Sequence, residues 1–402
     1  MQPISPSHPN PRASMTHIPV WGGALLREPT QRFLSWLTGK PREGDRPLFL
    51  WTPLARAGAT AMTLAAGISL SLWAIARGGV ASIALLPAFV LTVGALRAFY
   101  IELAHAAVHG TFLRKPSWDR FFVELFTTLT LMDHQRHFAV QHNRFHHRYT
   151  ASFLDPDYQT LLSWGFCPGM SRAALWRRLA WVLVSPSVQG AFLAGRLRRN
   201  FGAGVPQLRR LAAGLALLLP LALAASTGAW TGYMLAWLLP LTWGFQASSM
   251  LQMLGGEHLW GLGGEAGKSR MAELTVGRFL GDSYPEGRGV RSHLRRALWF
   301  LRLAFLHLPA RLAVYVGHDL GPAHDLHHRE LRSDWANAPY ERQAKQEAGS
   351  PGWPVPYTDF WGSLGAQIDR LFESLAGRLP LSAEELDELT TARERVAQAL
   401  DS

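Results

Sequence analysis

Four long apolar blocks limit most strongly what this chain can fold into. They occupy residues 57–76, 80–104, 211–226 and 229–254. The hydrocarbon core of a bilayer needs about 20 consecutive helical residues, and backbone groups inside it must pair within their own segment. Because only a few residues separate the members of each pair, we expect two helical hairpins that cross a membrane four times.

The positive charges predict how these hairpins are oriented. Fourteen Lys and Arg residues lie between His105 and Arg210, and seven precede residue 57, whereas the hairpin tips carry only Arg77. The positive-inside rule therefore places both tails and the segment between the hairpins in the cytoplasm. The Arg residues lie beside apolar blocks and no nucleic-acid recognition motif accompanies them, so their partner is predicted to be a membrane and not nucleic acid.

The blocks divide the chain into three predicted regions. Residues 1–54 form a cytoplasmic tail whose stretch at 25–37 is either an interfacial helix or a loosely ordered segment. Residues 55–340 form the membrane domain, in which the Arg-punctuated stretch at 176–197 predicts a single interfacial helix. Residues 341–402 form a second cytoplasmic tail with an amphipathic helix, which begins at a capping box of Ser382 and Glu385.

Histidines are clustered next to the apolar blocks. The three clusters are His105 and His109; His142, His146 and His147; and His324, His327 and His328. Residues three or four apart share one helix face, so each cluster can direct its imidazoles at one point. A closed zinc site takes four ligands, so these eight imidazoles predict two ions. With Cys167 as the sole cysteine, the ligands must be nitrogen or oxygen atoms.

The type of metal and the class of protein can be predicted from the chemistry of imidazole and the positions of the clusters. Imidazole suits zinc, copper, iron and nickel, and redox iron is the natural choice for oxygen chemistry on an unreactive substrate. The alternative from another class is a histidine-rich metal transporter, which predicts ligands inside the spans. Here the clusters lie beyond the predicted span ends, which favours an enzyme. His134 and His137 are either ligands in a shifted register or residues that lie on the helix surface or support the ligands, and His318 is a candidate extra ligand.

The clusters and their flanking residues resemble those of the membrane fatty acid desaturase superfamily, which includes hydroxylases, ketolases and decarboxylases. Gly110 follows the first box, and Arg148-Tyr149-Thr150 and Asp155-Pro156-Asp157 follow the second. The resemblance covers about residues 55–340. It implies a further ligand just after the fourth span, where His258 stands. The implied metal ligands are His105, His109, His142, His146, His147, His258, His324, His327 and His328.

The resemblance also implies a fold and an activity. The fold is all-α and integral to a bacterial-type inner membrane, with two hairpins and a cytoplasmic helical cap that holds two non-haem iron ions. The activity is oxidation of a C–H bond in a lipid-like substrate by O2. Desaturation of a fatty acyl chain is the first choice, and hydroxylation, ketolation and decarboxylation are the alternatives. Because the chain has no His-Pro-Gly-Gly haem motif, an external donor such as a ferredoxin is expected to supply electrons.

Carboxylates near the boxes are predicted to orient the ligands. A ligating histidine usually donates its second ring N–H to a carboxylate or carbonyl oxygen. The residues predicted to support the ligands in this way are Glu102, Asp155, Asp157, Glu257, His318, Asp319 and Asp325.

Overall fold

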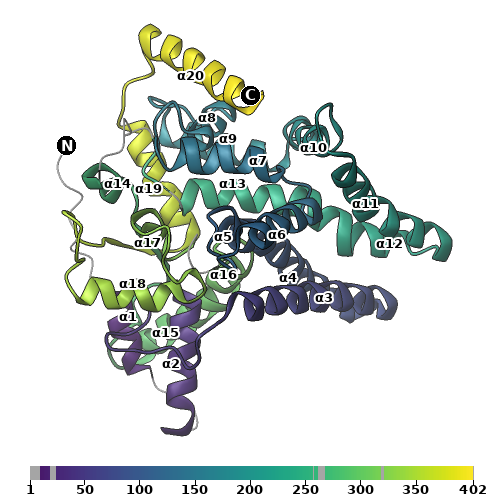
Figure 1. Ribbon diagram of the computed structural model, residues 1–402. Helices are drawn as coiled ribbons and strands as arrows, with labels where there is room; N and C mark the ends of the chain where they lie inside the picture. The colour runs from purple at the N-terminus through teal and green to yellow at the C-terminus, as the bar shows by residue number, and fades with distance from the viewer. Residues whose placement is uncertain (1–9, 19–23, 257, 261–267, 318–320, 402) are drawn as a thin grey trace. The chain divides into compact units, whose positions relative to one another are not determined.

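The computed structural model describes residues 10–18, 24–256, 258–260, 268–317 and 321–401. These residues are mostly helical, as predicted, and they also contain a small β-sheet (Figure 1). The chain divides into two compact units. Unit 1 comprises Met1–Leu50, Leu251–Leu259 and Ala266–Leu371, and unit 2 comprises Trp51–Met250, Trp260–Glu265 and Phe372–Ser402. The boundary falls within two helices, α13 (Phe245–Gly255) and α19 (Leu364–Ala376).

Unit 2 contains the apolar blocks and the first two histidine clusters. Its elements are α3 (Pro53–Arg77), η2 (Gly79–Ala84), α4 (Leu85–Ala98), η3 (Phe99–Ala104), α5 (His105–Val108), α6 (Pro116–Leu129), α7 (Gln135–Ala139), η4 (Val140–His146), α8 (Pro156–Ser163), α9 (Arg172–Val184), α10 (Pro186–Phe201), α11 (Gln207–Thr227), α12 (Trp230–Tyr233), η5 (Met234–Leu238), η6 (Pro240–Gly244) and α20 (Ala383–Asp401). The predicted capping box of α20 is confirmed, because the Glu385 backbone N–H donates to Ser382 Oγ and the Ser382 N–H donates to Glu385 Oε2.

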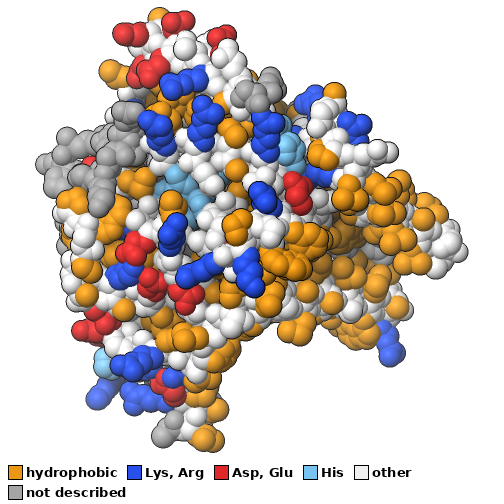
Figure 2. All heavy atoms as spheres, in the orientation of Figure 1, with side chains coloured by type: hydrophobic (Ala, Val, Ile, Leu, Met, Phe, Trp, Pro, Cys, Tyr) orange, Lys and Arg blue, Asp and Glu red, His pale blue; other side chains and the backbone are white. Residues whose placement is uncertain are grey.

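Three helices among the described residues are long and apolar enough to cross a membrane. They are Pro53–Arg77, Gly79–Val108 and Gln207–Thr227, and they match the first three predicted blocks. Figure 2 shows hydrophobic side chains gathered over α3, α11 and α12. The fourth block is helical from α12 to α13, but its Trp, Tyr, Pro and Gln residues make it less apolar than the other three.

The first two candidate spans form a tight hairpin. The Thr52 side chain accepts a hydrogen bond from the Ala55 N–H and so caps the start of α3. Gly78 and Gly79 join the helices with φ of 62° and 54°, a region that favours glycine. The helices approach so closely that a Cβ at Gly67 would lie 2.5 Å from an atom of the opposite helix. The hairpin therefore depends on small residues at its contacts as well as on its hydrophobicity.

Unit 1 contains the third histidine cluster and the sheet. Its elements are α1 (Pro11–Ser14), η1 (Met15–His17), α2 (Ala24–Thr38), α14 (Lys268–Leu274), β1 (Gly277–Leu280), α15 (Val290–Arg302), η7 (Leu303–His307), α16 (Leu308–Ala313), α17 (His324–Arg329), η8 (Trp335–Asn337), α18 (Ala338–Glu347) and β2 (Asp359–Gly362). Strands β1 and β2 pair in parallel, with Gly277 opposite Asp359. The predicted stretch at 25–37 is a helix, α2, and it packs with α15 and η7 around Leu34, Leu37 and Trp299.

Candidate metal centre

Two π-helical turns position the first two histidine clusters in unit 2. The turn η3 leads directly into α5, which carries His105 and is followed by His109. The turn η4 carries His142 and His146, and the His147 N–H donates to the carbonyl oxygen of His142, five residues earlier. Because a π-helical turn holds one residue more than an α-helical turn, His142 and His147 share a direction. Such turns are frequent at functional sites.

Four imidazoles of unit 2 converge on one point. Ligand nitrogens of His105, His109, His142 and His147 all lie within 4.8 Å of one another. The Nε2 atom of His142 is 2.6 Å from His105 Nε2 and 3.0 Å from His147 Nε2. Each neutral imidazole has one N–H and one nitrogen whose lone pair can bind a metal. A cation bound among these nitrogens would satisfy those lone pairs, so the donor set fits a metal that favours imidazole.

Burial keeps these rings in the state that binds metals. It is the main cause that lowers the pKa of His109 to about 3, and the nearby charge of His146 adds to the effect. Burial, with the charges of His105 and the other box histidines, lowers the pKa of His142 well below its ordinary value. Both imidazoles are therefore neutral near pH 7, and a metal does not have to displace a proton from either ring.

His146 belongs to a separate group with two carboxylates. Its Nδ1 atom lies 3.0 Å from Asp155 Oδ1 and 3.2 Å from Asp157 Oδ2. Asp155 is fully buried, caps α8 by accepting from the Asp157 N–H, and accepts from the N–H of Ala151, a residue with φ of 59°. This fixed carboxylate can hold the proton of His146 on Nδ1, which leaves Nε2 with a lone pair for a metal.

Three imidazoles converge in unit 1. Ligand nitrogens of His258, His324 and His328 lie within 4.8 Å of one another, and the Nε2 atoms of His258 and His324 are 3.1 Å apart. His258 is held by a β-bridge to Thr275, and the other two lie one turn apart on α17. His327 lies on the same buried helix, with its ring centroid 5.6 Å from that of His328. A residue in an irregular segment, His258, thus lies beside two residues of helix α17 that are far from it in sequence.

A buried ion network holds α17 within unit 1. Asp325, which is predicted to support a ligand histidine, accepts hydrogen bonds through its two carboxylate oxygens from Nε and an Nη atom of Arg342, each at 2.7 Å. The same guanidinium lies 2.9 Å from Asp359, whose other oxygen lies 2.7 Å from the Lys40 ammonium. Asp325, Arg342 and Lys40 are all at most 2% exposed. The network therefore joins α17 to α18, to β2 and to the chain that follows α2.

The network shifts the pKa values of its members. Burial, together with the charge of Arg342, lowers the pKa of Lys40 to about 8. Burial alone would raise the pKa of Asp359, but the charges of Arg342 and Lys40 outweigh it and lower that pKa below its ordinary value. Nothing in the local sequence identifies Arg342 as a partner of the third box, because it lies 17 residues beyond Asp325.

The remaining predicted residues are placed as follows. Glu102 is buried on η3, three residues before His105. His134 and His137 lie together at the start of α7, with ring centroids 4.2 Å apart, and they are not members of the histidine groups found among the described residues. The three predicted supporting residues Glu257, His318 and Asp319 lie outside the described residues.

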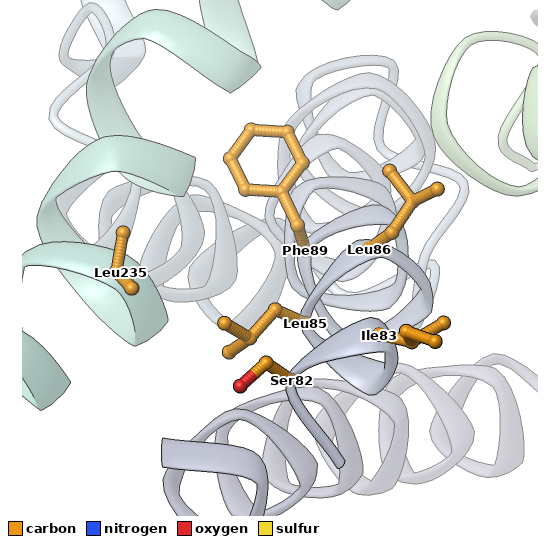
Figure 3. A pocket seen from close by; sticks show the side chains of 6 residues that line it. All are labelled: Ser82, Ile83, Leu85, Leu86, Phe89 and Leu235. Atoms are coloured by element: carbon orange, nitrogen blue, oxygen red, sulfur yellow. The ribbon is translucent and has the colours of Figure 1, made fainter. Parts of the chain in front are cut away.

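A pocket in unit 2 lies far from the first histidine box. Figure 3 shows its lining of Ser82, Ile83, Leu85, Leu86, Phe89 and Leu235. Its volume is about 460 Å³, and its lining is mostly apolar. Phe89 precedes His105 by 16 residues, so at 1.5 Å per helical residue the two are about 24 Å apart along the helix. This pocket is therefore not part of the candidate metal centre.

Comparison with known protein families gives one match. The model of a family described as fatty acid desaturase matches residues 81–309. The matched segment contains the first two histidine clusters and His258, and it ends before the third cluster. A comparison with curated proteins found no match.

Proposed function

Because this chain belongs to the fatty acid desaturase family, we propose that it is a membrane-bound non-haem diiron enzyme that oxidises a C–H bond of a lipid-like substrate with O2. Family membership by itself makes the chain an oxidoreductase associated with lipid and membrane. The reaction we favour is desaturation of a fatty acyl chain. Hydroxylation, ketolation and decarboxylation are the alternatives, and identification of the product would distinguish among these reactions.

The observation that carries this proposal is the convergence of imidazole nitrogens in each unit. Four converge in unit 2 and three in unit 1. We propose that these seven, with His146 and His327, bind two iron ions. The nine proposed ligands are His105, His109, His142, His146, His147, His258, His324, His327 and His328. The near absence of cysteine, with Cys167 alone, agrees with a site built from imidazole.

When bound, the two ions would supply the O2-dependent oxidation of an unactivated C–H bond, which no side chain can perform. The protein's part is to place and orient the ligands. Asp155 fixes the ring of His146 through Nδ1, and the Arg342 network fixes the helix that carries His324 and His328. Burial of His105, His146 and His258, each at most 3% exposed, restricts access of water to the ligands.

The membrane arrangement follows from the apolar blocks and the charges. We propose that all four blocks span a bacterial-type inner membrane as two hairpins, with both tails, a helical cap and the metal ligands in the cytoplasm. A lipid-like substrate would reach the site from the bilayer. An external carrier such as a ferredoxin would supply electrons, and an acidic carrier would be attracted to the Arg-rich cytoplasmic segments.

Product analysis tests the proposal. Lipids from cells that express the chain are compared by mass spectrometry with lipids from cells that express His146→Ala. A new double bond that His146→Ala abolishes supports desaturation, whereas a new oxygen atom or a shortened hydrocarbon selects one of the alternatives.

The matched control is His134→Ala, which removes an imidazole outside the histidine groups. It is expected to retain the product. If His146→Ala and His134→Ala affect the product equally, the assignment of His146 to the metal centre is wrong. If the wild-type chain yields no product that requires O2, the proposed oxidative function is wrong.

A further inference from the structure

Helix α15 packs against unit 1 with one face only. Its buried residues and those of the following turn η7 are Ser292, Trp299, Leu303 and His307, whose spacings of seven, four and four residues place them on one face. The Trp299 ring contacts Tyr284, and its N–H donates to the carbonyl oxygen of Asp282. The Asp282 carboxylate lies 2.8 Å from Arg302 and 3.4 Å from His307. This face is therefore fixed, and the helix is not free to turn it outward.

The opposite face of α15 and η7 is apolar and exposed. It consists of Val290, Leu294, Leu298, Leu301 and Phe305, which are 50% to 85% exposed. Their spacing of four, four, three and four residues keeps them in one row along the helix. Soluble surfaces rarely display a continuous row of large apolar side chains, so this row is expected to be covered.

The charges beside this row point to an anionic partner. Arg291 and Arg295 are exposed and flank the row on one side, and Arg302 is half exposed. The sequence has no Asp or Glu from residue 287 to residue 318, but six Arg residues. A strongly two-sided helix with Leu and Phe on one face and Arg beside it is typical of helices that lie in a membrane interface, where the Arg side chains meet anionic headgroups.

Among the described residues, unit 1 contains no helix that is long and apolar enough to cross a membrane. All three candidate spans belong to unit 2. Helix α2, which packs with α15 around a shared core, also exposes Leu25, Phe33 and Trp36. Two packed helices of unit 1 thus each expose an apolar row, although no candidate span was found in the part of this unit that the structure describes.

We infer that α15 lies on the surface of an anionic bilayer, with Val290, Leu294, Leu298, Leu301 and Phe305 among the acyl chains and Arg291 and Arg295 at the headgroups. This gives the unit that carries His258, His324 and His328 its own contact with the membrane. A second copy of the chain is a poorer occupant, because residues 287–318 contain six Arg and no Asp or Glu, so the same stretch of a second copy offers no carboxylate to pair with these Arg residues. The inference concerns the membrane contact alone and does not depend on the reaction proposed above.

Spin-label accessibility in nanodiscs tests the inference with the full chain. In a Cys167→Ser background, a nitroxide is attached at Leu298→Cys in the exposed row and, as the matched control, at Arg295→Cys on the same helix. Collision rates with O2, which concentrates in acyl chains, and with a water-soluble nickel chelate are measured by power saturation. The nanodiscs contain either a mixture of phosphatidylglycerol and phosphatidylcholine or phosphatidylcholine alone.

We expect O2 collisions to dominate at residue 298 and nickel collisions to dominate at residue 295, with a greater difference when phosphatidylglycerol is present. Equal access of nickel to both sites would overturn the inference, because the row would then face water. Protection of residue 298 from both reagents would also overturn it and would indicate a protein partner. Equal results in the two lipid mixtures would overturn the anionic recognition. None of these readouts involves catalysis, so failure of the proposed enzyme activity would be seen separately.

Discussion

Replacing Arg342 with Met is expected to destabilise unit 1 strongly. The change removes the guanidinium that donates to both oxygens of Asp325 and that pairs with Asp359. The Asp325 carboxylate is fully buried, and its remaining donor is the N–H of Leu326. Removing one partner of a buried ion pair costs about 3–5 kcal/mol, because the other charge stays buried without compensation.

Thermal unfolding of the detergent-solubilised protein measures this cost. A loss of 1 kcal/mol lowers Tm by about 2–4 °C in a unit of 150–250 residues, so we expect Tm to fall by about 6–20 °C. Unfolding can be followed by the fluorescence of the tryptophans, among them the buried Trp299, Trp335 and Trp361 of unit 1.

The control is Lys345→Met on the same helix, α18. Lys345 pairs with Glu330 and Glu341, but all three side chains are partly exposed, and such pairs contribute about 0–1 kcal/mol. A double variant, Asp325→Asn with Arg342→Met, is expected to lose less than the sum of the single variants, because the uncompensated charge is gone. Equal Tm values for Arg342→Met and Lys345→Met would refute the reasoning.

Three further predictions concern single contacts. Asp155→Asn keeps the size of the side chain but weakens the acceptor for His146, so metal affinity in a competition titration is expected to fall about 10–100-fold; an unchanged affinity would show that Asp155 does not support a ligand. Ser382→Ala removes the cap of α20 and is expected to cost about 1 kcal/mol, seen as faster hydrogen exchange in the first turn of that helix, and unaltered exchange there would exclude a role for the cap. Asp359→Asn is expected to destabilise the protein more at pH 7 than at an acidic pH below the unfolded pKa of about 3.9: the folded state lowers the pKa of Asp359, so the stabilisation is fully present above the unfolded pKa and is lost as the pH falls through the lower folded value. The same destabilisation at both pH values would contradict that assignment.

The hydropathy pattern predicted three of the long apolar helices, because the ability of a helix to cross a bilayer depends on composition over about 20 residues. Three blocks were found as long apolar helices, although the second continues four residues past its predicted end, through His105 to Val108. The capping box of α20 was also predictable, since its two residues are close in sequence. The stretch at 176–197 is two helices instead of one, because Pro186 begins a new helix after Ser185.

Strand pairing and side-chain contacts between residues far apart in the sequence could not be predicted. Strands β1 and β2 have four residues each and lie about 80 residues apart, so neither carries a periodic pattern long enough to detect. The sequence predicted which histidines cluster, but it did not predict the π-helical turn that pairs His142 with His147. It also did not predict that the Asp325 carboxylate pairs with Arg342, which lies 17 residues farther along the chain.

The central claim is that the nine histidines hold two iron ions. Metal analysis of anaerobically purified protein, combined with Mössbauer spectroscopy of the iron-57 form, tests it most directly. We predict two irons per chain with a spectrum of nitrogen-ligated high-spin iron, and loss of iron in His324→Ala. One iron per chain, or zinc with no iron, would contradict the claim.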